Sequence, residues 1–279
     1  MSKQSPSPSQ QVITDELWAV LEPLLPPRPT PKGPGGRPRA SDRAALEGIM
    51  FVLSTGCRWR DLQPQMGFGS GVTCWRRLRH WQDAGVWERL HRTILDELGQ
   101  LDAICWERHC IDAVSVRAKK GGELVGRSPV DRGKKGSKYH LLTDSQGIPL
   151  NLLLSAGNTH DSKLFEPLLE TAPAIKTPGP GRPRRRPRKL HADKGYDNPR
   201  CRRYLHRRGI KVRIARRGKD SSQRLGAHRW VVERSVAWLM TFRRLDRRWD
   251  RTEKTTTALL TLAAAYTALR FLIKARHQL

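Results

Sequence analysis

Three carboxylates that lie far apart in the chain have sequence surroundings that suit metal binding. Asp112 lies in HCIDAVSVRA, Asp193 in KLHADKGYDN and Glu233 in HRWVVERSVAWLMTFRRL. Mg²⁺ prefers oxygen ligands and is usually held by one or two carboxylates together with substrate phosphate. A two-metal nuclease needs about three carboxylates around ions roughly 3.5–4 Å apart. The three segments therefore predict metal-dependent chemistry on a phosphodiester bond.

Both aspartates also have a structural interpretation. Asp112 lies in an otherwise hydrophobic or alternating strand, where an ionised carboxylate without a partner is costly. A metal would be such a partner, and so would Arg117 or Lys119. Asp193 ends the short strand KLHAD, and sites in α/β sheets gather at the carboxyl ends of strands. An aspartate before a glycine turn is also a common turn or cap residue, so this alternative stays open.

Glu233 lies within a predicted helix. Trp230 and Ala237 are its neighbours at spacings of three and four, and such residues pack a helix on a sheet. We therefore expect Glu233 to point toward the edge of the core and not to be freely solvated. A salt bridge to Arg229 or Arg234 is the alternative.

The charge of the chain points to a polyanionic partner. The chain has 279 residues, with 53 Lys and Arg against 26 Asp and Glu, and a net charge of +27. A compact protein this positive repels itself unless a polyanion neutralises it, and DNA contacts also release condensed counterions. Basicity that serves only solubility is the alternative. A ribosomal or chromatin protein could be as basic, but it would not usually need a core of this length or nine tryptophans.

Cysteine usage and hydropathy favour a cytoplasmic protein without a membrane segment. The N-terminal MSKQSPSPSQQ has no apolar region typical of a secretory signal. The most apolar stretch, 258–273, is interrupted by polar residues and is expected to be too short to span a bilayer. Five scattered cysteines contain no CxxC pair, so buried thiols are favoured over a zinc site at Cys105, His109 and Cys110.

The first part of the chain predicts a small helical DNA-binding domain. Residues 1–11 are expected to be disordered, and 12–99 to form helices at about 14–24, 41–56, 59–62, 70–85 and 86–98, with a Pro/Gly-rich basic linker after the first. A glycine-bearing turn before a basic helix is typical of a helix-turn-helix, in which Arg76, Arg77 and Arg79 would contact DNA. A helical bundle whose arginines face water is the alternative. Trp75 and Trp81 are expected to pack inward.

The second part, 103–279, predicts a mixed α/β layer. Strands are expected at 107–117, in a hairpin that turns at 144–147, and at KLHAD and IKVRIARR. Helices are expected at 161–170, 199–208, 226–243 and 254–275, and a basic low-complexity loop at 174–189. Three strands in a meander followed by α/β units give the order of an RNase H-like fold.

These segments together resemble a known family. HCIDAVSVRA, GSKYHLLTDSQGIPLNLLLSAGNTHDS, LHADKGYDN and WVVERSVAWLMTFRRL are similar to bacterial insertion-sequence transposases of the DDE type, close to the insertion-sequence-five group. ITDELWAVLEPLLPP, GRPRASDRAALEGIMFVLSTGCRWRDL and GVWERL resemble the DNA-binding region of the same family. The resemblance covers about 12–275.

The resemblance implies specific roles for residues of this chain. Asp112, Asp193 and Glu233 match the catalytic triad, which is expected to bind two Mg²⁺ or Mn²⁺ ions. The motif NTHDS places His160 and Asp161 where they could support the metal ligands, with a helix cap as the alternative. Arg234, Arg243 and Arg244, which follow Glu233, could hold DNA phosphate; a salt-bridged surface is the alternative, and their basic character suits either role.

The sequence thus predicts a transposase that hydrolyses a phosphodiester bond at its element's ends and joins the freed 3′ hydroxyl to target DNA. Double-stranded DNA and further copies of the chain are the expected partners, and the cytoplasm, at the bacterial nucleoid, is the expected location. A catalytically inactive relic or a sequence-specific DNA-binding regulator is the first alternative. A structure-selective nuclease on the same fold, which would cut without joining, is the second.

Overall fold

The structure is a computed structural model that describes residues 13–27, 39–216, 218 and 222–278, with the side chains of 222–229 left out. The predicted disordered N-terminus and residues 28–38 of the linker lie outside the described residues.

The described N-terminal part is helical, as predicted. Its helices are α1 (Asp15–Leu21), η2 (Glu22–Leu24), α2 (Asp42–Thr55), η3 (Trp59–Asp61), η4 (Pro64–Met66), α3 (Gly71–Asp83) and α4 (Val86–Gln100). Capping side chains fix where they begin: the Ser41 hydroxyl accepts from the amide of Ala44 at 3.0 Å, and the Ser70 hydroxyl from that of Thr73 at 3.2 Å. Gly56 ends α2 in the left-handed conformation, which glycine adopts without strain.

The connection between α2 and α3 contains the short helix predicted at 59–62. A helix-turn-helix joins its helices by a turn of about 3–4 residues. Here residues 56–70 intervene and contain both η3 and η4. The helical region and the short helix predicted at 59–62 are confirmed, and Gly67 and Gly69 lie directly before the basic helix α3, while the whole connection is longer than a usual helix-turn-helix turn.

The sheet has the strand order of the predicted RNase H-like fold. Its strands are β1 (Arg108–Ala118), β2 (Gly126–Arg127), β3 (Lys135–Asp144), β4 (Pro149–Ala156), β5 (Lys189–Ala192), β6 (Lys211–Ile214) and β7 (Arg247–Arg248). They lie in the order β2-β3-β1-β5-β6, with β4 on β3 and β7 on β1. β1 is antiparallel to β3 and β3 to β4, while β5 is parallel to both β1 and β6.

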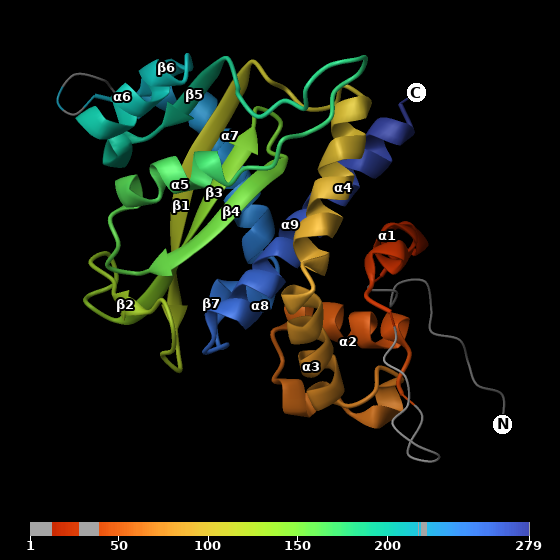
Figure 1. Cartoon of the computed structure of the whole chain (residues 1–279). Coiled ribbons are helices and arrows are strands. Elements are labelled where there is room, and N and C mark those ends of the chain that lie inside the picture. The colour runs from red at the N-terminus through yellow and green to blue at the C-terminus, as the bar shows by residue number, and fades with distance from the viewer. Residues whose placement is uncertain (1–12, 28–38, 217, 219–221, 279) are drawn as a thin grey trace.

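Helices cover the sheet (Figure 1). They are η5 (Asp161–Lys163), α5 (Phe165–Glu170), η6 (Lys194–Tyr196), α6 (Pro199–Arg207), α7 (Ser222–Met240), α8 (Arg243–Asp246) and α9 (Glu253–Arg276). α5 packs on β3 and β4, α6 on β6, and α7 on β1, β3 and β5. The short elements β2, α8 and β7 had no counterpart in the prediction, because segments this short carry no periodic signal.

α9 joins the two parts of the chain. It packs against α3 and α4 as well as against β4, so buried residues from both parts form one continuous core. Contrary to the prediction, α9 is long and apolar enough to span a bilayer by length and composition, but 67% of its most apolar window is buried within the protein. A core helix passes the same test, and its packing assigns α9 to the core. The division into domains 12–99 and 103–279 stays a prediction.

Candidate active site

The register of two parallel strands brings Asp112 and Asp193 to the same level of the sheet. The last recorded pair between β1 and β5 is Cys110 with His191, and the two aspartates each lie two residues further along. Residues two apart on a strand share a face. Asp193 keeps an extended backbone, with φ −77° and ψ 180°, so the alternation continues to it. Both carboxylates therefore project from the same face of the sheet, at the level of two adjacent strands, β1 and β5.

Strand pairing also identifies that face. Asp112 is paired with Leu141 of β3, so it shares a face with Leu141 and with Tyr139 two residues before it. The Tyr139 hydroxyl donates to the carbonyl of Leu245 in α8 at 3.2 Å. The face of Asp112 is thus the one covered by α8 and by α7, the helix that carries Glu233.

Glu233 is placed differently from the expectation. Its side chain is exposed and does not lie at the edge of the core. Val231, Val232 and Ser235 are the α7 residues that point inward nearby, and the Ser235 hydroxyl donates to the Gly147 carbonyl at 2.8 Å. Among the residues whose side chains are described, no three His, Cys, Asp or Glu side chains lie close enough together to hold a metal ion.

Tyr196 is a component of the site that the sequence did not single out. It follows Asp193 in η6, is 1% exposed, and its hydroxyl has no hydrogen-bond partner among the described residues. Burial raises the pKa of Tyr196 well above its ordinary value, and the negative charges of Asp112, Asp161 and Asp193 raise it further. The Tyr196 hydroxyl is therefore a buried group that feels the charge of both strand-end aspartates and of Asp161. The sequence signal that could have identified Tyr196 is its position three residues after Asp193, at the end of a strand.

Asp161 is anchored by a lysine of the sheet. Lys138 of β3 donates from Nζ to Asp161 Oδ1 at 2.8 Å and to the Thr159 carbonyl at 2.9 Å, and it is buried. His160 caps η5: its Nδ1 accepts from the Ser162 amide at 3.3 Å. The NTHDS motif thus holds Asp161 in an ion pair with Lys138. The helix-cap alternative also fits, because η5 begins at Asp161 and His160 supplies its cap.

The donor chemistry of the site fits a divalent cation. The carboxylates of Asp112 and Asp193 provide hard oxygen ligands on adjacent segments of the sheet. Mg²⁺ and Mn²⁺ prefer ligands of this type. Each accepts a short backbone hydrogen bond: Asp112 Oδ1 from Ala113 at 2.8 Å, and Asp193 Oδ1 from Gly195 at 2.9 Å. Arg117, an alternative partner for Asp112, instead bonds Asp131 at 2.9 Å through Nη2.

The predicted DNA-contacting arginines of α3 separate into two groups. Arg76 is exposed, and the Arg79 guanidinium lies over the Trp75 ring at 4.6 Å. Arg77 is 8% exposed and forms a buried ion pair with Asp42 of α2, so the prediction that it contacts DNA is corrected. Position 77 lies on the inner face of α3, and a charge there needs a carboxylate partner.

The arginines after Glu233 separate in the same way. Arg243 is exposed. Arg234 lies between the rings of Trp230 and Trp238, at 4.5 and 4.6 Å, and donates to the Gln146 carbonyl at 2.7 Å. Arg244 is 5% exposed and ion-paired with Asp250 at 2.8 Å, so its predicted DNA contact is corrected.

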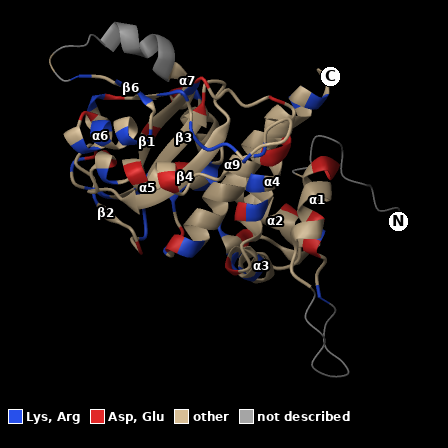
Figure 2. Ribbon diagram, turned by 45° about the horizontal axis from the view of Figure 1, so that its top comes forward, with Lys and Arg blue, Asp and Glu red and all other residues tan. Residues whose placement is uncertain are grey.

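The predicted basic loop 174–189 is held against the protein. Ile175 and Arg184 exchange backbone hydrogen bonds at 2.8 and 2.7 Å, and Arg184 lies over the Trp106 ring at 5.0 Å. Arg186 donates to the Arg208 carbonyl at 3.0 Å, beside the basic helix α6. Figure 2 shows Lys and Arg gathered around α6. The loop and α6 thus both carry a dense positive charge, and the Arg186–Arg208 hydrogen bond connects the loop to the end of α6.

Three features define the class of protein: the strand order, the two aspartates at the same level of adjacent strands, and the strong positive charge. Together they define an RNase H-like enzyme that processes nucleic acid. Comparison with known families agrees. Residues 13–91 match a family described as a putative transposase of the IS4/5 family, and residues 107–268 match the transposase DDE domain. The chain belongs to this family of DDE transposases and is a DNA transposase, an enzyme of DNA cleavage and transposition.

Relatives from Burkholderia cepacia are similar to parts of the chain. The insertion element IS402 uncharacterized 16.2 kDa protein is 55% identical over 124 residues, which is 43% of this chain and 83% of the relative. The putative transposase for insertion sequence element IS402 is 44% identical over 131 residues, 47% of this chain and 62% of the relative. The match thus spans less than two thirds of that second relative.

Solved structures were also found. The Mos1 strand transfer complex is 12% identical with a TM-score of 0.26, and the match covers 88% of this chain and 81% of that one. The Mos1 mariner paired-end complex with Mn is 12% identical with a TM-score of 0.22, and the match covers 88% and 82%.

Proposed function

We propose that this transposase binds the two ends of its insertion element as a multimer, hydrolyses a phosphodiester bond there, and uses the freed 3′ hydroxyl to attack target DNA. Mg²⁺ or Mn²⁺ is the proposed cofactor, two ions per site. The observation that carries the proposal is the register of β1 and β5, which aligns Asp112 with Asp193. The proposed location is the cytoplasm, at the nucleoid.

Asp112, Asp193 and Glu233 are the proposed metal ligands. Bound ions would activate the attacking oxygen and stabilise the leaving oxygen. α7 covers the strands that carry the two aspartates, which supports Glu233 as the third ligand. Lys138 and Asp161 would restrict the mobility of the neighbouring carboxylates by their ion pair.

Basic side chains of the described surface would hold the DNA. Arg76 of α3 and Arg243 after α7 are exposed and are the proposed phosphate contacts among the arginines predicted from the sequence. Arg79 and Arg234 carry aromatic stacking partners, which fix the orientation of their guanidinium groups. The loop 174–189 adds further basic residues, and Figure 2 shows Lys and Arg around α6.

The test uses the purified full chain, DNA carrying an element end, and Mg²⁺. Asp112→Ala, Asp193→Ala and Glu233→Ala should each reduce cleavage by more than the roughly 10- to 100-fold that follows loss of an outer-shell partner. End binding, measured without divalent metal, should persist in all three variants. Glu170→Ala, at an exposed carboxylate of α5, is the matched control. Full cleavage by any of the three variants contradicts its assigned role.

The products distinguish the alternatives. Joined target DNA identifies transposition, whereas cleavage of branched DNA without joining identifies a structure-selective nuclease. Protection of end DNA without cleavage under either metal identifies a regulator or an inactive relic.

A further inference from the structure

A pocket of about 770 Å³ lies between the helical region and the RNase H-like part, away from the paired aspartates. One wall is the connection after α2, residues 56–61, and a second is the connection before α9, residues 249–252. Trp75 of α3, Lys120 from the loop after β1, Arg244 of α8 and Thr255 of α9 complete the lining. Its volume is within the roughly 300–1,000 Å³ range of small-molecule sites.

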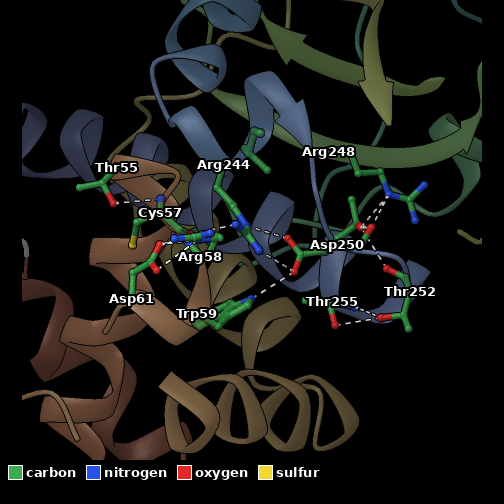
Figure 3. Close-up of polar contacts among 12 residues, drawn as sticks. Thr55, Cys57, Arg58, Trp59, Asp61, Arg244, Arg248, Asp250, Thr252 and Thr255 are labelled. Carbon is green, nitrogen blue, oxygen red and sulfur yellow. Dashed lines mark hydrogen bonds and ion pairs between the residues drawn. The ribbon is translucent and has the colours of Figure 1, made fainter. Parts of the chain in front are cut away.

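Polar contacts hold the two walls together, as Figure 3 shows. Arg244 donates to both carboxylate oxygens of Asp250, at 2.8 and 3.1 Å, and to the Cys57 carbonyl at 2.9 Å. The Trp59 indole donates to Asp250 at 3.2 Å. Arg248 fastens the second wall to β3, through the Ser137 hydroxyl at 2.7 Å. These buried contacts preorganise the pocket, and they explain why Arg244 is not free to bind DNA.

The pocket is positively charged. Its two carboxylates already have partners, since Asp61 bonds Arg58 at 2.9 Å and Asp250 bonds Arg244. Arg60, Lys120 and Arg251 also line it; these three are exposed, and in the described part of the chain no ion pair is recorded for them. The excess charge suits one or more phosphate groups.

The pocket also has an aromatic lining. Trp59, Trp75 and Trp249 all border it and are partly exposed. Aromatic rings beside free cations are the combination with which proteins bind single strands, where the bases stack and the phosphates meet the cations. A paired base would first have to be unpaired and unstacked, at a cost of a few kcal/mol, before it could enter a pocket, whereas an unpaired base avoids most of that cost. Shape and chemistry together select an unpaired nucleotide.

We propose that this pocket binds one unpaired nucleotide of a DNA strand, with its base against the tryptophans and its phosphate near Arg60, Lys120 and Arg251. The proposal rests on the proposed function, because the strand would belong to the DNA that the transposase processes. One wall belongs to the helical region and the other to the segment before α9. A nucleotide held between them would therefore fix the helical region and the sheet relative to one DNA strand.

The experiment measures binding by the full chain to a fluorescent duplex with one central unpaired nucleotide, without divalent metal. The same duplex with an abasic residue at that position, and the fully paired duplex, are the comparisons. The wild-type chain should prefer the base-bearing duplex to the abasic one by about tenfold. A 2-aminopurine at the unpaired position should lose fluorescence on binding, since stacking on tryptophan quenches it.

Two variants and one control test the pocket itself. Trp249→Ala should remove most of the preference and the quenching, and Arg60→Ala with Lys120→Ala should weaken binding of the unpaired duplex more than that of the paired one. Arg60 and Lys120 are exposed, so this second variant should fold even if Trp249→Ala does not. Lys211→Ala removes an exposed charge at β6, outside the pocket, and should leave the preference unchanged.

The outcomes separate this proposal from the proposed function. Equal affinity for the base-bearing and abasic duplexes, with paired end DNA still bound, overturns the pocket proposal alone. Loss of all DNA binding would instead contradict the proposed function. Competition by free deoxyadenosine monophosphate at the same concentration as the oligonucleotide would overturn the strand assignment, because the pocket would then bind free nucleotides.

Discussion

At the scale of single residues, position within a helix decides whether an arginine can meet DNA. Arg76 and Arg77 are neighbours in α3, yet Arg76 is exposed and Arg77 is buried against Asp42. The sequence predicted DNA contact for both. A basic helix therefore combines groups that bind a ligand with groups that hold the fold, and their chemical type does not distinguish them.

Substitution of these two arginines should give opposite results. Arg77→Ala removes the buried Arg77–Asp42 ion pair but leaves Asp42 bonded to the more exposed Arg39 at 3.2 Å, so it should lower the free energy of unfolding by about 1–3 kcal/mol, as loss of a hydrogen bond to a charged group does. Arg76→Ala should change it by less than about 0.5 kcal/mol, the range of surface substitutions, while weakening DNA binding. Urea unfolding and DNA titration of both variants provide the measurement. Equal stability of the two would contradict the assignment.

At the scale of elements, the β3–β4 hairpin depends on a buried carboxylate. Asp144 is fully buried in the turn and accepts from the amides of Cys105 at 3.0 Å and of Gln146 and Ile148 at 2.9 Å. Burial raises the pKa of Asp144 to about 6, although these hydrogen bonds oppose the shift. The hairpin thus carries an acid that titrates near neutrality.

The sign of the resulting pH dependence follows from linkage. The folded state holds the Asp144 proton more tightly than the unfolded chain, whose aspartate pKa is about 3.9. Protonation of Asp144 therefore contributes to the free energy of unfolding. This contribution is fully present below about pH 4 and is lost as the pH rises through about 6, which lowers the free energy of unfolding by about 3 kcal/mol. Urea unfolding from pH 4 to 7 should show a smaller decrease for Asp144→Asn. Asp102→Asn, at an exposed carboxyl, is the control and should reproduce the wild-type slope.

At the scale of the whole molecule, charge dominates the interaction with DNA. The net charge is +27, and basic residues are concentrated on α6 and in the loop 174–189. α9 ties the helical region to the sheet, so DNA held by one part is positioned relative to the other.

Affinity for DNA should therefore fall steeply with salt. If about 6–10 phosphates are contacted, the affinity should fall roughly 10³- to 10⁵-fold between about 50 and 200 mM salt, because each contact releases counterions. Fluorescence anisotropy with end DNA over this range measures the slope. An affinity that hardly changes would show that few phosphates are neutralised. Arg76→Ala should reduce the slope by about one contact, whereas Arg77→Ala should not.

The sequence by itself determined the fold class, the main helices and strands, the family and the candidate carboxylates, because periodicity, caps and local motifs are properties of short segments. Only the tertiary structure decided which side chains meet. The β1–β5 register aligned Asp112 with Asp193, Lys138 of β3 paired with Asp161 from the segment after β4, and Glu233 proved exposed. Arg77 and Arg244 are buried because other segments pack against the faces of α3 and α8 on which they lie. The sequence of a helix does not specify which segment packs against it.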